Sequence, residues 1–284
     1  MSLAFLRLRN RTLRLALRNP PFLAGMAILI FVILVALAAP WLYPGDPLDM
    51  VGMPTLWPGE DPAYPFGTDS LGRDLAAGLA HGARVSLLTG ISATVIGLSI
   101  GTAIGAIAGY FGGWVDNVLV RVTELFQTVP TFLLVVVLVS IREPTALTIA
   151  LSIGAASWPT VARLVRAQFR SLRGADFVAA ALVSGATSTR IILRHILPSA
   201  APQIVVTTSV MVANAILTEA ALSFLNLGDP NLVSWGSIIG DGRQLLRTAW
   251  YLTALPGTAI ALTVMSINLA GDGLNDILNP RSGN

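Results

Sequence analysis

Few residues in this chain could carry out bond chemistry. It has no cysteine, so disulfides, thiolate nucleophiles and thiolate-bound metals are excluded. The two histidines, His81 and His195, are far apart in the sequence, which argues against a metal centre. All 18 basic residues are arginines, and without lysine the chain cannot build the G-x-x-x-x-G-K-[ST] loop that binds nucleotide phosphates. We therefore expect no catalysis and no cofactor here, and if ATP drives the protein, another chain must bind the ATP.

The polar residues between Asp176 and Pro198 have a spacing that suggests two short helices rather than a catalytic site. Asp176 can cap the N-terminus of the first helix, DFVAAALVS. Gly185 stands where a left-handed residue ends a helix. Thr187 or Ser188 can then cap a second helix, which we expect Pro198 to end.

This basic segment must dock on something, because isolated helices of this length are marginal in water. Arg190 and Arg194 lie one helical turn apart. One interpretation is an amphipathic helix on the lipid surface, and the other is a helix that fits a groove in a partner protein. The alanines at positions 179–181 make the first helix weakly amphipathic, which favours the partner. The residues expected to form this docking site are Asp176, Phe177, Ala179, Ala180, Ala181, Gly185, Arg190, Arg194 and Pro198.

The elements that carry this segment are predicted to be membrane-spanning helices. The chain is 54% hydrophobic and only 12% charged, with a mean hydropathy of +0.72. An uncharged run of about 18 residues is long enough to cross a bilayer as a helix. We therefore predict an all-α polytopic membrane protein with six transmembrane helices, at Phe22–Ala39, Val85–Tyr110, Val118–Ile141, Ala146–Leu164, Pro202–Leu225 and Leu252–Ala270.

The arginines indicate an orientation, since they favour cytoplasmic flanks. They cluster before the first span and after the fourth, whereas residues 42–82 are rich in Pro, Gly and acids. Both termini are therefore expected to be cytoplasmic. A cleaved signal peptide ending at Ala36-Leu37-Ala38 is the alternative for the first span, but its apolar run is too long for that. The predicted organisation is a tail and first span (1–41), an extracytoplasmic loop (42–82), a five-helix core (83–275) with the docking helix at about 176–186, and a cytoplasmic tail (276–284).

The second span contains a glycine at every fourth position: Gly97, Gly101, Gly105 and Gly109. Residues four apart share one helix face, and without side chains a neighbouring helix can approach to backbone contact. A flexible hinge is the alternative. We expect close helix packing.

The docking segment resembles the "EAA" loop of binding-protein-dependent ABC importer permeases. The resemblance lies in Ala180-Ala181, Gly185 and the Ile196-Leu197-Pro198 end. In that family the loop is the coupling helix, which sits in a cleft of the ATPase subunit. Ala179 stands where the family has an acid, so the resemblance implies docking by packing rather than by an ion pair there.

Other stretches resemble one branch of that family, the dipeptide, oligopeptide and nickel permeases, and its "C"-type subunit with an extra N-terminal span. These stretches cover nearly the whole chain. They are FGTDSLGRD (66–74), GARVSLL (82–88), GYFGGWVD (109–116), SWPTVARLVRAQFRSLR (157–173), LTEAALSFLNLG (217–228), SWGSIIGDGR (234–243) and NLAGDGLNDILNPR (268–281).

The resemblance implies a type I ABC importer permease fold and the import of di- or oligopeptides across the bacterial inner membrane, with nickel or glutathione as other cargoes. It implies a sister permease, two ATPase subunits that bind ATP and Mg, and an extracytoplasmic solute-binding protein. No nucleic-acid partner is expected. Polar residues within spans usually face the bundle or a cavity, so the candidate residues of a translocation path are Asn214, Glu219 and Asn268. The alternative for Glu219 is that it holds a helix end. The rivals are an ion-coupled secondary transporter using Glu124 and Glu219, and a purely structural membrane anchor.

Overall fold

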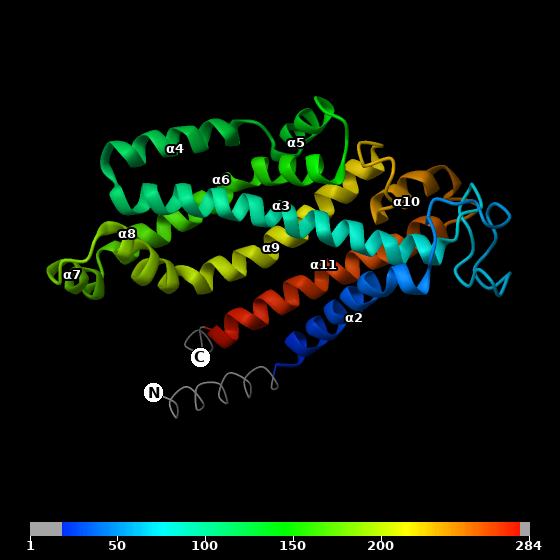
Figure 1. Ribbon diagram of the computed structural model, residues 1–284, viewed down its shortest axis with the longest axis horizontal. Helices are drawn as coiled ribbons and strands as arrows, with labels where there is room; N and C mark the ends of the chain where they lie inside the picture. Colours follow the sequence, from blue (N-terminus) through cyan, green and yellow to red (C-terminus); the bar gives the residue numbers. More distant parts are fainter. Residues whose placement is uncertain (1–18, 279–284) are drawn as a thin grey trace.

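The computed structural model describes residues 19–278, and every regular element within that range is a helix (Figure 1). This confirms the all-α prediction, while the arginine-rich N-terminus and Arg281 lie outside the described residues. The elements are α2 (Pro20–Leu42), α3 (Leu75–Phe111), α4 (Gly113–Thr128), α5 (Thr131–Ser140), α6 (Ala146–Arg173), α7 (Asp176–Val183), α8 (Ser188–Ile191), a π-helical turn (Ile192–Ile196), α9 (Leu197–Phe224), α10 (Trp235–Gly242), a 3₁₀ turn (Arg243–Leu245) and α11 (Tyr251–Leu278).

Five of these helical stretches are long and apolar enough to cross a membrane: α2, α3, α6, the stretch from Ser188 to Phe224, and α11. The predicted span at Val118–Ile141 is not one continuous helix, because α4 and α5 meet at a bend of 80°. The cause is Pro130, which disfavours helical dihedrals at the residue before it. Val129 is accordingly extended, with φ −94° and ψ 131°. A sixth span exists if this bent pair crosses the membrane as one unit.

The structure also moves several predicted boundaries. The loop expected over 42–82 ends earlier, because α3 begins at Leu75. The Asp74 side chain accepts a hydrogen bond from the Ala76 N–H at 2.9 Å and caps that helix. The fourth span does not end near Leu164 but continues through its arginine-rich end, to a C-cap at Gly174. The helices thus extend beyond the apolar runs that identified them.

The glycine ladder packs α3 against α6, as predicted. A Cβ added at Gly101 would lie 2.6 Å from the Trp158 carbonyl oxygen, and one at Gly105 would lie 2.5 Å from the Ala162 carbonyl oxygen. Gly109 makes the same kind of approach further along the helix. Only hydrogen fits between the two backbones at these positions, so the glycines set the distance between α3 and α6.

The short α4 is held mainly near its N-terminus. Its outward side chains are largely exposed and apolar, and only Asp116 and Thr123 are buried. The Asp116 carboxylate accepts two hydrogen bonds from the Arg166 guanidinium on α6, at 2.5 and 2.7 Å. A bidentate pair of this kind fixes both distance and orientation. It connects α4 to the helix that also packs on the glycine ladder.

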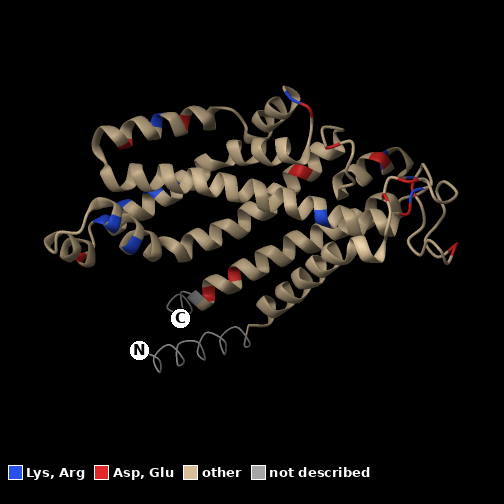
Figure 2. Cartoon of the chain, in the orientation of Figure 1, with Lys and Arg blue, Asp and Glu red and all other residues tan. Residues whose placement is uncertain are grey.

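The bundle has two distinct ends (Figure 1). The turn formed by α7 and α8 projects at one end, where basic residues gather near the end of α6 (Figure 2). Residues 43–74 and α10 lie at the opposite end. There the Tyr251 hydroxyl donates toward the Leu56 and Thr68 carbonyl oxygens, at 2.8 and 3.1 Å, and ties the loop to α11. The predicted loop is therefore ordered.

Candidate functional site

The helix α7 is anchored by a single buried side chain. Val178 is completely buried and packs in a cluster with Phe169 of α6, Ile191 of α8 and Ile196 of the π-helical turn. All four side chains in this cluster are fully buried. Because α7 is only eight residues long, this contact is what holds it at the end of the bundle.

The rest of α7 is apolar and open. Phe177 is 40% exposed, Leu182 is 55% exposed and Val183 is 91% exposed. The small side chains of Ala179 and Ala180 are also exposed and lie on the same short helix. An apolar tip built around small residues can fit closely into a groove, which is the geometry of helix-in-groove recognition.

The end of α7 is a Schellman motif centred on Gly185, as the sequence predicts. Gly185 has φ +76°, its N–H donates to the Leu182 carbonyl oxygen, and the Ala186 N–H donates to the Ala181 carbonyl oxygen, both at 3.0 Å. The start of α7 differs from the prediction. The N-cap is Ala175, and Asp176 is the first helical residue without a side-chain cap bond. Its carboxylate can still favour the helix through the macrodipole.

The second helical piece also differs from the prediction at its end. Thr187 caps α8, accepting from the Arg190 N–H at 3.4 Å. Pro198 does not end the helix, because it lies in the first turn of α9 and the chain runs on to Phe224. The preceding π-helical turn bonds the Leu197 N–H to the Ile192 carbonyl oxygen and shifts the register where proline has no N–H to donate.

Arg190 and Arg194 are both exposed on this second piece. Neither forms an ion pair with the acidic residues of the described chain, whose salt bridges join other residues. They stand beside the apolar tip of α7 as free positive charges. The docking surface therefore has an apolar centre on α7 and a basic flank on α8 and the π-helical turn.

The structure does not bring the three predicted path residues together. Asn214 is exposed and lines a cavity of about 420 Å³ between α3, α5, α6 and α9. Glu219 lies on the same helix but is only 2% exposed. Asn268 is exposed on α11 and does not line this cavity. Two other exposed polar residues of the cavity, Thr131 and Thr160, are not predicted from the sequence, because single threonines in an apolar run resemble their neighbours in hydropathy.

Glu219 joins α9 to α3 inside the bundle. Its carboxylate accepts hydrogen bonds from the Ser86 hydroxyl of α3 at 2.9 Å and from the Ser223 hydroxyl one turn further along α9 at 2.8 Å. Both carboxylate oxygens thus have a donor, which is what a buried carboxylate requires. This geometry supports the packing alternative for Glu219.

Replacement of Ser86 by alanine should destabilise the bundle by about 1–3 kcal/mol, because one buried carboxylate oxygen loses its donor. The measurement is the free energy of unfolding of the purified chain in a mixed-micelle titration. The control is Ser99→Ala on the same helix, since that exposed hydroxyl bonds only to the Val95 carbonyl oxygen. Equal stability of the two variants would show that the Ser86 bond contributes nothing.

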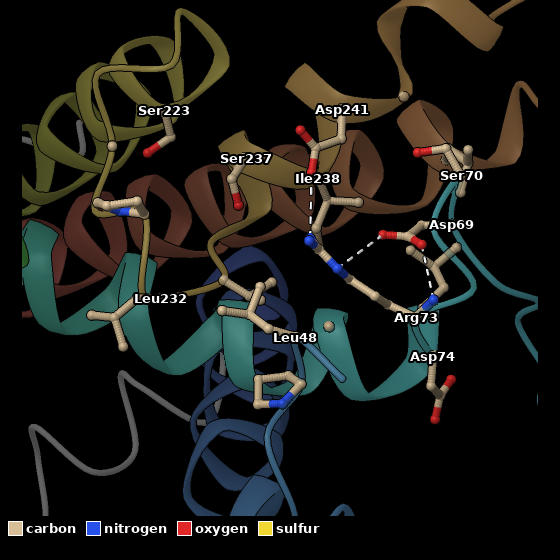
Figure 3. Close-up of a pocket in the computed structure, with 18 of the residues that line it drawn as sticks. Leu48, Asp69, Ser70, Arg73, Asp74, Ser223, Leu232, Ser237, Ile238 and Asp241 are labelled. Carbon is tan, nitrogen blue, oxygen red and sulfur yellow. Dashed lines mark hydrogen bonds and ion pairs between the residues drawn. The ribbon is translucent and has the colours of Figure 1, made fainter. Parts of the chain in front are cut away.

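A second cavity, of about 290 Å³, lies at the end opposite to α7 (Figure 3). Arg73 extends between two carboxylates there, 3.9 Å from Asp69 and 3.8 Å from Asp241 of α10. Burial raises the pKa of the Asp241 carboxyl, while Arg73 acts in the opposite direction. As the pH falls, the Asp241 carboxylate is therefore protonated at a higher pH than a solvent-exposed aspartate, and its ion pair with Arg73 is lost there. This contact connects the ordered loop to α10.

Two family models match this chain. Residues 101–284 match "Binding-protein-dependent transport system inner membrane component", and residues 8–56 match "N-terminal TM domain of oligopeptide transport permease C". The second match covers the extra N-terminal span. Together they include the docking helix, most of the lining of the Asn214 cavity and most of the glycine ladder.

Curated relatives are similar over almost their whole length. A probable peptide ABC transporter permease protein of Sinorhizobium fredii is 42% identical, over 96% of this chain and 93% of the relative. The oligopeptide transport system permease protein OppC of Haemophilus influenzae is 38% identical, over 93% and 86%. A glutathione transport system permease protein of Pectobacterium atrosepticum is 36% identical, over 91% and 86%.

Solved structures of the MetNI methionine ABC transporter in inward-facing conformations share the fold. One chain aligns with a TM-score of 0.56 at 21% identity, over 68% of this chain and 93% of the MetNI chain. At this identity the similarity concerns the fold alone. It supports the type I importer permease architecture predicted from the sequence.

Proposed function

Because this chain belongs to the family of binding-protein-dependent transport system inner membrane components, we propose that it is the permease subunit of an ATP-driven importer of di- and oligopeptides. The multi-pass architecture fits this function, since five helical stretches and the bent α4–α5 pair are apolar enough to cross a membrane. The permease supplies half of a path and carries out no bond chemistry itself.

The observation that carries the proposal is the exposed apolar tip of α7. Val178 and its neighbours fix the helix to the bundle, while Phe177 is 40% exposed and Val183 is 91% exposed. We assign α7 as the coupling helix that inserts into a cleft of a partner ATPase. The basic flank of Arg190 and Arg194 would stay outside the cleft. Ala179 provides no charge, so the contact depends on shape and apolar burial.

The assembly we propose contains this chain, a sister permease, two ATPase subunits and a solute-binding protein outside the membrane. The α7 end would face the cytoplasm, in agreement with the arginines near the end of α6 (Figure 2). The loop over 43–74 and α10 would then face the solute-binding protein. The sister permease would cover the cavity of Asn214, because exposed polar groups in a span are costly against lipid.

Transport would follow from movement of α7. ATP binding closes the two ATPases, the coupling helices move with them, and the permease pair changes from an inward-facing to an outward-facing state. The tight α3–α6 crossing lets these helices move as one rigid unit. ATP and Mg are bound by the partner subunits.

Uptake should stop when the P-loop lysine of the partner ATPase is replaced by alanine. The reason is that this chain contains no lysine and cannot supply a nucleotide site of its own. The measurement is peptide uptake into proteoliposomes that contain the full complex and internal ATP. Uptake that continues in the lysine variant and follows an imposed proton gradient would favour the secondary-transporter alternative.

Glutathione is the second cargo to consider, because a glutathione permease is 36% identical to this chain. Nickel remains an expectation from the family resemblance alone. The cognate solute-binding protein can decide between them. We expect di- or oligopeptides to raise its melting temperature, and stabilisation only by glutathione or by nickel would reassign the cargo.

A further inference from the structure

The cavity of Asn214 has an uncharged lining. Its volume is about 420 Å³, and four helices contribute to it. The polar members are hydroxyls and one amide, and the others are apolar. The lining residues are Thr94, Thr131, Phe132, Val135, Ile153, Ser157, Thr160, Met211, Asn214, Ala215, Leu217, Thr218 and Ala221.

Some of these polar groups are already engaged within their own helices. The Thr94 hydroxyl donates to the Gly90 carbonyl oxygen at 2.8 Å, and the Thr218 hydroxyl donates to the Asn214 carbonyl oxygen at 2.8 Å. The Ser157 hydroxyl donates back to its own helix in the same way. These bonds satisfy the hydroxyl hydrogens locally, so the three groups can offer only acceptor positions to a ligand.

Three other polar side chains in the cavity are unengaged. The side chains of Thr131, Thr160 and Asn214 are exposed, and none has a hydrogen-bond partner within residues 19–278. They come from α5, α6 and α9, so they approach the cavity from three directions. Between them they provide two hydroxyls, an amide N–H₂ and an amide oxygen. Such a set matches a ligand that presents both donors and acceptors but no required charge.

We propose that Thr131, Thr160 and Asn214 hydrogen-bond the backbone amides of a peptide in transit, and that this half of the path does not distinguish peptides by side-chain charge. The inference rests on the proposed function. Every peptide has the same backbone N–H and C=O groups, whatever its side chains. A neutral lining favours neither sign of side-chain charge, so it does not separate cationic from anionic peptides.

A charge placed in this cavity should therefore make peptide uptake depend on the side-chain charge of the peptide, which we expect it not to do in the natural chain. The chain has no cysteine, so Asn214→Cys provides a single labelling position in it. The complete transporter, with cysteine-free partner subunits, is modified after assembly with a cationic or an anionic methanethiosulfonate reagent. Uptake is then measured for three tripeptides that carry a lysine, an aspartate or only alanines. Modification after assembly avoids any effect of the charge on folding.

The anionic label should raise the ratio of cationic to anionic peptide uptake, and the cationic label should lower it, each by about tenfold, since unit charges interact strongly outside bulk water. Unlabelled complex provides the reference ratio. Ser99→Cys is the matched control, because Ser99 is also an exposed polar residue in a span but lies outside the cavity. If the complex with Asn214→Cys does not assemble, Thr160→Cys places the label in the same cavity.

Equal ratios with the two labels would overturn the proposal. So would an equal shift from Ser99→Cys, or a failure of the Asn214→Cys thiol to react in the assembled complex. The proposed function fails in a different way: the unmodified natural complex would then take up none of the three peptides in the presence of ATP.

Discussion

Replacement of Gly185 by arginine is expected to abolish peptide uptake while the chain still inserts into the membrane. Gly185 ends α7 with φ +76°, a conformation that costs other residues roughly 1–2 kcal/mol. A Cβ at this position meets no atom of the chain within 4 Å. The arginine side chain would therefore project into the space beside the apolar tip of α7, where the ATPase is proposed to dock. The damage should fall on the contact between subunits and not on the bundle.

Two further substitutions of Gly185 separate the effect of backbone strain from the effect of side-chain size. Gly185→Asn keeps a residue that tolerates the left-handed conformation, so most transport should remain. Gly185→Ala adds the strain but little bulk, so its uptake should fall between the other two. The measurements are ATP-dependent uptake in proteoliposomes and co-purification of the ATPase subunits. Uptake at the natural rate by the Gly185→Arg complex would remove α7 from the coupling role.

Replacement of Gly101 by leucine is expected to prevent the bundle from folding. A Cβ at Gly101 would lie 2.5 Å from the Val161 Cβ and 2.6 Å from the Trp158 carbonyl oxygen, and neither atom can move without the backbone of α6. Overpacking a core usually costs about 1–3 kcal/mol, and a whole leucine side chain at this crossing should exceed that range. The helices α3 and α6 would have to separate along their length, which would also open the neighbouring contacts at Gly97 and Gly105.

The matched control is Gly257→Leu in α11, where an added Cβ meets nothing within 4 Å of it in the chain. Both substitutions raise apolar character and helix propensity to the same extent. The measurements are the yield of monodisperse chain in detergent and its thermal stability. A Gly101→Leu chain that is as abundant and stable as Gly257→Leu would show that the ladder is a hinge, which was the alternative drawn from the sequence.

Local chemistry made several features predictable. The membrane class follows from the scarcity of charge over long runs, because the cost of placing charge in hydrocarbon does not depend on the fold. The Schellman turn at Gly185 follows from a single residue that tolerates positive φ. The ladder of α3 follows from helical periodicity alone, since residues four apart must share a face. Each of these depends on neighbours within about one helical turn.

The effect of two prolines on their helices was not predictable from the sequence, because it depends on the structure around each proline. Pro198 has no N–H to donate and was expected to end a helix, yet the π-helical turn before it lets the helix continue. Pro130 lies within the predicted third span, where it pushes Val129 into an extended conformation and bends the α4–α5 pair by 80°. Proline in a sequence shows where a helix is disturbed, and the surrounding packing decides whether it ends, bends or continues.

The position of the polar side chains in the spans was decided only by the tertiary structure. Asn214 and Glu219 are five residues apart on α9, which places them about 140° apart around the helix. One therefore faces the open cavity beside Thr131 and Thr160, and the other faces Ser86 on α3. Hydropathy identifies both as polar residues in a span, but it does not show which direction around α9 is packed. That direction is set by α3, α5 and α6, whose positions depend on contacts far apart in the sequence.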